Sequence, residues 1–93
     1  MDKKYKVLVI EDEDLLADAI RRKLEVDGLG VDSCKSGREG IELLSKPEKL
    51  PDVIWLDYYL KDMNGLEFVN ALKKNSEWSK IPIVVVSNSA NNE

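Results

Sequence analysis

The 93-residue sequence contains no histidine and a single cysteine, Cys34. Without histidine, a Ser-His-Asp or Cys-His catalytic group, a histidine-ligated zinc site and a phosphohistidine on this chain are all excluded. One cysteine cannot form an internal disulfide, and its place in an apparent strand is typical of a small buried side chain in a reducing compartment. Any chemistry of this chain must therefore use carboxylates, hydroxyls or lysines.

Long hydrophobic runs and an excess of basic residues are also missing. No apolar segment approaches the roughly 20 residues that span a bilayer, and the first residues show no signal-peptide core, so we expect a cytoplasmic protein without a membrane segment. The net charge is −4, from 14 basic and 18 acidic residues. This balance argues against nucleic-acid binding by this segment, because phosphate contacts depend on clustered Lys and Arg.

What the sequence does contain is a regular alternation of apolar runs and helical patterns. Strands are predicted for four apolar runs, at residues 5–10, 31–34, 52–56 and 81–86. Helical spacing of apolar residues predicts three intervening helices, the first capped by Asp14 and the second by Ser36. A turn at Asn64-Gly65 precedes the third. This order predicts an α/β fold with parallel strands and helices on both faces of the sheet.

Acidic residues stand at the carboxyl ends of two predicted strands. The first strand ends in VIEDED and the third in WLDYY, so Glu11, Asp12 and Asp57 are expected at one edge of the sheet. In a doubly wound sheet of order 2-1-3-4, that edge is where the strand order reverses and ligands bind. Converging carboxylates favour Mg²⁺, and Ser87 after the fourth strand offers a hydroxyl to a bound anion. The combination predicts phosphoryl transfer to an Asp carboxylate.

A simpler interpretation accounts for part of this cluster. Acidic residues are common at helix starts because they stabilise the helix dipole, and Glu13 and Asp14 need no other role. Asp57 is different, since it directly follows an apolar strand and is not simply a cap. The functional interpretation therefore depends mainly on Asp57.

At these residues the sequence resembles the receiver domain of two-component response regulators. The matching segments are VLVIEDED, VIWLDYYLKDMNGLEF and IPIVVVS, in the usual order and spacing. Gly65 stands where the family has its turn glycine. The resemblance covers the whole chain and implies that residues 1–93 are a receiver domain with a flavodoxin-like, doubly wound parallel sheet.

The resemblance also implies a role for each site residue. Asp57 would accept a phosphoryl group from the phosphohistidine of a sensor histidine kinase or a histidine phosphotransfer protein. Glu11 and Asp12 would bind Mg²⁺ together with Asp57 and the backbone carbonyl of Tyr59. Ser87 would hydrogen-bond the phosphoryl group and move on activation. Such a chain is at most a self-phosphorylating and autodephosphorylating acceptor, rather than an enzyme with turnover.

The departures from the family pattern lie at Glu11, where Asp is commonest, in the loop after Asp57 and in the C-terminal part. Lys61 stands where proline is frequent, and Asn88 where a small residue is usual. Receivers normally continue through a fourth helix, a fifth strand that ends in an essential lysine, and a fifth helix, whereas the sequence stops at Glu93. The missing lysine leaves open a second function, that of a non-catalytic interaction module. A Mg²⁺-dependent phosphatase of the haloacid dehalogenase type would need a second Asp where Tyr59 stands.

The fourth predicted strand is expected at the edge of this sheet. The segment IPIVVVS carries no charged residue that would discourage pairing, and a long apolar edge recruits another strand. We therefore expect the 93-residue chain to self-associate through this strand, to exchange elements with a second copy, or to need a partner segment that supplies the missing strand and helices.

Overall fold

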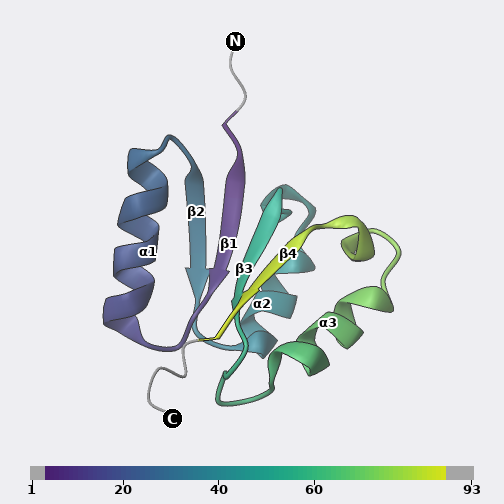
Figure 1. Cartoon of the computed structure of the whole chain (residues 1–93). Coiled ribbons are helices and arrows are strands. Elements are labelled where there is room, and N and C mark those ends of the chain that lie inside the picture. The colour runs from purple at the N-terminus through teal and green to yellow at the C-terminus, as the bar shows by residue number, and fades with distance from the viewer. Residues whose placement is uncertain (1–3, 88–93) are drawn as a thin grey trace.

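The computed structural model describes residues 4–87, which form one parallel sheet flanked by helices (Figure 1). The elements are β1 (Lys6–Ile10), α1 (Asp14–Val26), β2 (Gly30–Cys34), α2 (Gly37–Leu44), a 3₁₀ turn η1 (Pro47–Lys49), β3 (Val53–Asp57), α3 (Gly65–Lys73), a 3₁₀ turn η2 (Trp78–Lys80) and β4 (Ile83–Val86). The strands lie in the order β2-β1-β3-β4, and every neighbouring pair is parallel. The predicted doubly wound, flavodoxin-like arrangement is confirmed.

The two faces of the sheet are covered by different helices. The main core lies on the face covered by α2 and α3 and consists of Leu8, Ile10, Cys34, Leu44, Ile54, Leu56, Leu60, Phe68 and Leu72. Val9 and Trp55, which are paired across β1 and β3, alternate with these residues and point to the opposite face. There Trp55 shares a groove with Ile20 and Leu24 of α1. Within the described residues, α1 contributes no fully buried side chain, so its face of the sheet is less completely covered.

The first helix begins differently from its prediction. Glu13, not Asp14, occupies the N-cap position, and its side chain makes no capping hydrogen bond. Asp14 lies in the first turn, where a negative charge favours the helix dipole, and its carboxylate pairs with Lys35 at 2.9 Å. The predicted cap of the second helix is confirmed, because Ser36 Oγ accepts a hydrogen bond from the Glu39 N–H at 3.1 Å.

The third strand and the third helix enclose the loop of residues 58–64. β3 runs one residue further than predicted and includes Asp57 as its last member. The predicted turn ends at Asn64, which is the N-cap of α3. Its side chain accepts a hydrogen bond from the Glu67 N–H at 2.8 Å, and the Glu67 carboxylate accepts one from the Asn64 N–H at 2.9 Å. This reciprocal capping box sets the point at which the loop after β3 becomes helical.

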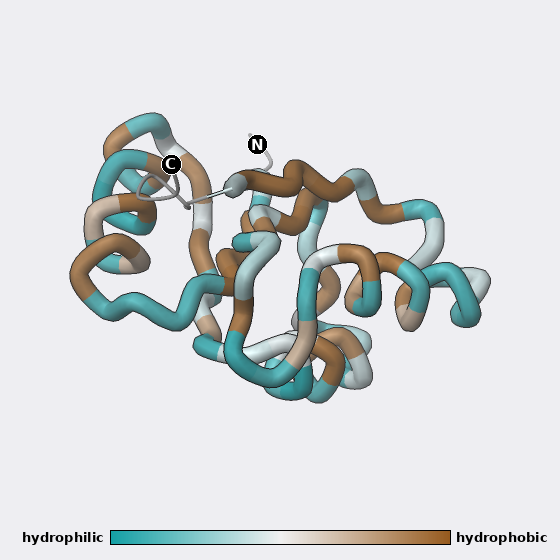
Figure 2. The backbone as a smooth tube through the Cα atoms, turned by 60° about the horizontal axis from the view of Figure 1, so that its bottom comes forward, coloured by the Kyte–Doolittle hydropathy of each residue, from teal (hydrophilic) through white to brown (hydrophobic). Residues whose placement is uncertain are grey.

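β4 forms the edge of the described sheet beside β3. Val84 and Val85 are each 47% exposed, and Figure 2 shows β4 as a hydrophobic stretch along one margin of the molecule. Asn88, Glu93 and the other residues between them lie outside the described residues, as do residues 1–3. Across residues 4–87, no helix combines the length and the apolar character needed to cross a membrane.

Candidate metal centre

Three carboxylates meet at the carboxyl ends of β1 and β3. Glu11 and Asp12 directly follow β1, and Asp57 ends β3. One carboxylate oxygen from each residue can be chosen so that all three lie within 4.8 Å of one another. The register explains this, since Ile10 pairs with Leu56 and the residues that follow them, Glu11 and Asp57, therefore lie at the same level. The structure therefore brings together the three acidic residues that the sequence placed at this edge.

Two of these carboxylates are unusually buried. Glu11 is 1% exposed and Asp57 is 3% exposed, whereas Asp12 is partly exposed. Burial is the main factor that raises the pKa of each buried group, and the neighbouring acidic charges raise it further. A hydrogen bond from a backbone N–H opposes the shift in each case, from Glu13 to Glu11 and from Tyr59 to Asp57, both at 3.1 Å. Both carboxyls resist ionisation unless a cation compensates their charge.

One oxygen of Glu11 tests whether a metal would fit here. Oε2 accepts the Glu13 N–H, but the buried Oε1 has no hydrogen-bond partner among residues 4–87. Leaving a buried carboxylate oxygen unpartnered is costly, and a divalent cation would satisfy it. The donors are all oxygens, from Glu11, Asp12 and Asp57. This set suits Mg²⁺ better than metals that prefer nitrogen or sulfur ligands.

Tyr59 and Ser87 lie at the same edge of the sheet. The Tyr59 N–H donates to Asp57 Oδ1, and an isolated antiparallel bridge between Tyr59 and Asn64 folds the intervening loop back on itself. Val86 is paired with Asp57 across β3 and β4, so Ser87, the next residue, emerges beside the carboxylates. All five predicted site residues are thus at one edge, and their chemical roles stay predictions.

Sequence reasoning missed one residue of this region, Asp62. Its two carboxylate oxygens accept hydrogen bonds from the backbone N–H groups of Gly37 and Arg38, at 3.0 Å each. Burial acts to raise the pKa of Asp62, but these hydrogen bonds and the Arg38 charge lower it below its usual range. In the sequence, Asp62 is only a carboxylate in a turn-rich segment. Its partners, Gly37 and Arg38, lie 25 and 24 positions away in the chain, so no local pattern indicates them.

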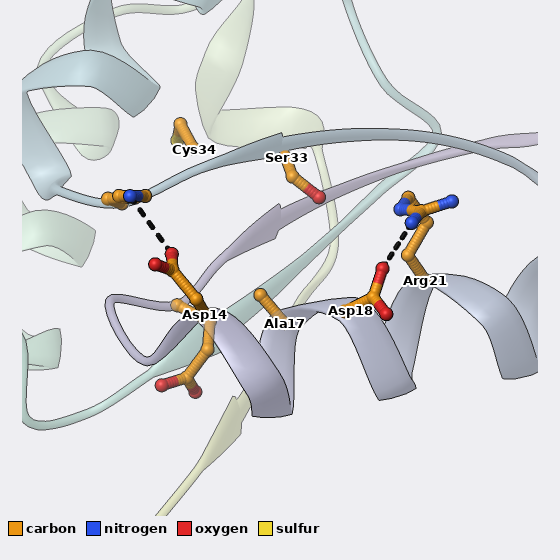
Figure 3. Close-up of a pocket in the computed structure, with 8 residues that line it drawn as sticks. Asp14, Ala17, Asp18, Arg21, Ser33 and Cys34 are labelled. Atoms are coloured by element: carbon orange, nitrogen blue, oxygen red, sulfur yellow. Dashed lines mark hydrogen bonds and ion pairs between the residues drawn. The ribbon is translucent and has the colours of Figure 1, made fainter.

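A pocket of about 220 Å³ lies between α1 and β2 (Figure 3), and Glu11 is among the residues that line it. Its charged walls are paired, because Lys35 contacts Asp14 at 2.9 Å and Arg21 contacts Asp18. Cys34 lines the same pocket, and burial raises the pKa of its thiol to about 12. The prediction of a buried, unreactive cysteine is in line with this environment.

Known proteins of one family match this chain along most of its length. The family model of the response regulator receiver domain matches residues 7–93. The chain is 34% identical over 82 residues to the phosphate regulon transcriptional regulatory protein PhoB of Rhizobium meliloti, covering 88% of this chain and 35% of that protein. It is 37% identical over 81 residues to the KDP operon transcriptional regulatory protein KdpE of Escherichia coli, covering 87% and 34%. The chain therefore spans about a third of the length of these curated relatives.

Solved structures give the same result for the fold. The chemotaxis response regulator CheY4 of Vibrio cholerae superposes with a TM-score of 0.78 at 31% identity, covering 89% of this chain and 68% of that chain. The phosphorylated cyanobacterial phytochrome response regulator RcpA superposes with a TM-score of 0.81 at 27% identity, covering 96% and 69%. In each comparison the other chain contains residues beyond the matched part.

Proposed function

Because the chain belongs to the response regulator receiver domain family, we propose that it accepts a phosphoryl group on Asp57 in a Mg²⁺-dependent reaction. The observation that carries this proposal is the burial of Asp57 at a strand end, within reach of two further carboxylates. A buried acid in that setting is costly to the fold, and a role in binding a cation and reacting with phosphorus accounts for it. In this proposal residues 1–93 make up one receiver unit.

The carboxylates of Glu11, Asp12 and Asp57 and the carbonyl of Tyr59 would hold the Mg²⁺, which when bound neutralises charge on the phosphoryl oxygens. Asp57 Oδ1 is engaged by the Tyr59 N–H, so Oδ2 is left to attack phosphorus. The new oxygen–phosphorus bond forms as the bond from phosphorus to the donor imidazole nitrogen breaks, and the imidazole leaves neutral because its ring takes up a proton from the solvent. The Ser87 hydroxyl then donates a hydrogen bond to a phosphoryl oxygen.

The phosphodonor in this proposal is a phosphohistidine of a sensor histidine kinase or of a histidine phosphotransfer protein. The sequence of 93 residues contains no histidine, so the phosphohistidine has to come from outside it. We place this exchange in the cytoplasm. Net charge −4 also supports protein partners rather than nucleic acid for this segment.

Phosphorylation by acetyl phosphate in the presence of Mg²⁺ tests the assignment of Asp57. Intact-mass analysis should show one added phosphoryl group on the wild-type chain, stable in acid and lost in base as expected of an acyl phosphate. Asp57→Asn should show none, and Asp12→Ala or chelation of Mg²⁺ should greatly reduce the label. Asp52→Asn is the matched control, because Asp52 immediately precedes the same strand at its other end. Equal labelling of wild type and Asp57→Asn would remove Asp57 from this role.

The same experiment separates the receiver function from the alternative of a non-catalytic interaction module. Lys80 ends η2 and precedes β4, at the end of the strand opposite to Asp57, so it is not placed to contact a phosphoryl group there. Because Lys80 does not take the place of the lysine that the family uses at this site, we expect the 93-residue chain to be labelled slowly and only in part. A chain that binds Mg²⁺ but never takes the label would fit the interaction module.

We also propose that β4 mediates self-association of the 93-residue chain, with a second copy of the same chain as the occupant. Val84 and Val85 on this edge strand are both about half exposed. A groove beside Trp78 is lined in part by Ile83 and Val85 of β4. The backbone N–H and C=O groups of an edge strand can form hydrogen bonds with another strand. A second copy of the chain presents the same edge strand.

A further inference from the structure

The loop that follows the proposed phospho-acceptor is held firmly at its base. This acceptor loop comprises residues 58–64, between β3 and α3. The Tyr59 N–H donates to Asp57 Oδ1 at 3.1 Å, and the Gly65 N–H donates to the Tyr58 carbonyl at 2.8 Å. The antiparallel bridge between Tyr59 and Asn64 closes the loop across its width. These contacts fix where the loop leaves the sheet, but they do not reach its tip.

The tip of the acceptor loop is anchored to a different element, the N-terminus of α2. Asp62 accepts hydrogen bonds from the Gly37 and Arg38 N–H groups at 3.0 Å each. The next donor of that helix turn, the Glu39 N–H, is taken by Ser36 Oγ at 3.1 Å. Asp62 therefore completes the capping of α2 with a carboxylate, whose charge favours that helix end. The bonds are charge-assisted and join two segments that are distant in sequence.

Packing at the same point shows how closely the loop tip meets α2. Gly37 is buried, and a Cβ added to it would lie 2.5 Å from the sulfur of Met63. The residue that donates to Asp62 is thus also the residue on which Met63 packs. Hydrogen bonding and packing both fix the loop tip at Gly37, so the loop has contacts that define its position at two places.

We propose that Asp62 is a positioning residue that holds the acceptor loop so that the Tyr59 carbonyl faces the carboxylate cluster. The inference rests on the proposed function, in which the Tyr59 carbonyl is a Mg²⁺ ligand. Groups that fix the orientation of a ligand raise metal affinity because the ligand does not have to be ordered on binding. Asp62 would act through the loop, without contacting the metal.

The test compares Asp62→Ala with Asp52→Ala in the 93-residue chain. Asp52 also uses its carboxylate to accept a backbone N–H, that of Lys6 at 2.8 Å, but it does so at the opposite end of β3. Mg²⁺ titration followed by amide NMR signals should give a Kd about 10-fold higher for Asp62→Ala than for wild type. Asp52→Ala should change the Kd by less than about twofold, although it loses a similar hydrogen bond.

Two further readouts separate positioning from a general loss of stability. In metal-free protein, the Tyr59 amide signal should shift in Asp62→Ala and stay in place in Asp52→Ala. Asp62→Asn keeps one acceptor oxygen and should give a Kd between those of wild type and Asp62→Ala. If Asp62→Ala does not fold, Asp62→Asn gives the answer through the same two measurements.

The outcomes distinguish this inference from the function on which it rests. Wild-type affinity and an unmoved Tyr59 signal in Asp62→Ala would overturn the positioning role. If the wild-type chain bound no Mg²⁺, the proposed metal site would fail, and the Tyr59 signal of the metal-free variants would still decide whether Asp62 positions the loop.

Discussion

Asp57 and Glu11 occupy positions where an ionised carboxylate lowers the stability of the metal-free chain. Burial raises the pKa of both groups, and neighbouring acidic charges add to the effect. A raised pKa means that the folded chain binds the proton more tightly than the unfolded chain does. The stability that these two groups contribute is therefore fully present below their ordinary pKa values and is lost as the pH rises through the raised values.

Replacing Asp57 by Asn should accordingly stabilise the metal-free chain at neutral pH. We expect a gain of about 1–3 kcal/mol in the free energy of unfolding, the usual scale for relieving an incompletely satisfied buried polar group. The difference from wild type should shrink as the pH falls through the raised pKa of Asp57, because the native carboxyl is then protonated. Urea unfolding in the presence of a chelator measures it.

The control for this prediction is Asp52→Asn, which removes one negative charge near the other end of β3 and should give no such gain. Adding Mg²⁺ should stabilise the wild-type chain and leave Asp57→Asn largely unchanged, because ligand binding to the folded state adds to its stability. A loss of stability in Asp57→Asn at neutral pH would contradict the proposed cost of burying this charge.

At the scale of elements, the start of α3 depends on a local pair of hydrogen bonds. Asn64 and Glu67 cap the helix reciprocally, so Asn64→Ala should lower the free energy of unfolding by about 1 kcal/mol. In a domain of this size that corresponds to a fall of about 4–8 °C in Tm. Asn70→Ala, at an exposed position within the same helix, is the matched control.

Asn70→Ala should be neutral or slightly stabilising, because alanine favours the helix interior. Thermal unfolding followed by circular dichroism compares the two variants under the same conditions. Equal Tm values for Asn64→Ala and Asn70→Ala would show that the capping box contributes little to the stability of the fold.

At the scale of the whole molecule, we expect the exposed edge of β4 to mediate association between copies of the 93-residue chain. Burial of apolar surface contributes about 25 cal/mol per Å², so covering the exposed valines of β4 and the groove beside Trp78 would be a sizeable gain for a small domain. Sedimentation velocity at micromolar concentration should show concentration-dependent association of the wild-type chain. Val84→Lys places a charge on the edge strand and should shift the chain to monomer.

Val26→Lys is the control for this experiment. Val26 is 82% exposed at the end of α1, and a lysine there should leave the association unchanged. A wild-type chain that sediments as a monodisperse monomer and unfolds cooperatively would show that β4 does not recruit a second copy.

Much of the fold and of the candidate site follows from short stretches of sequence. The order of strands and helices could be predicted because apolar periodicity is a local property, within one or two residues at most ends. The meeting of Glu11, Asp12 and Asp57 could be predicted as well, since parallel strands bring their carboxyl ends to one edge of the sheet. These features depend on backbone geometry that any sequence with this pattern shares.

Only the tertiary structure decided how far each group is buried and which partner it meets. Asp14 lies in the first turn of α1 and pairs with Lys35, whereas the sequence pattern predicted that it caps this helix. The carboxylate of Asp62 accepts hydrogen bonds from the N-terminus of α2, because the acceptor loop packs against Gly37. Such contacts join positions that are distant along the chain, and their geometry depends on how whole elements pack. Local patterns place residues on elements, and packing between elements determines what those residues touch.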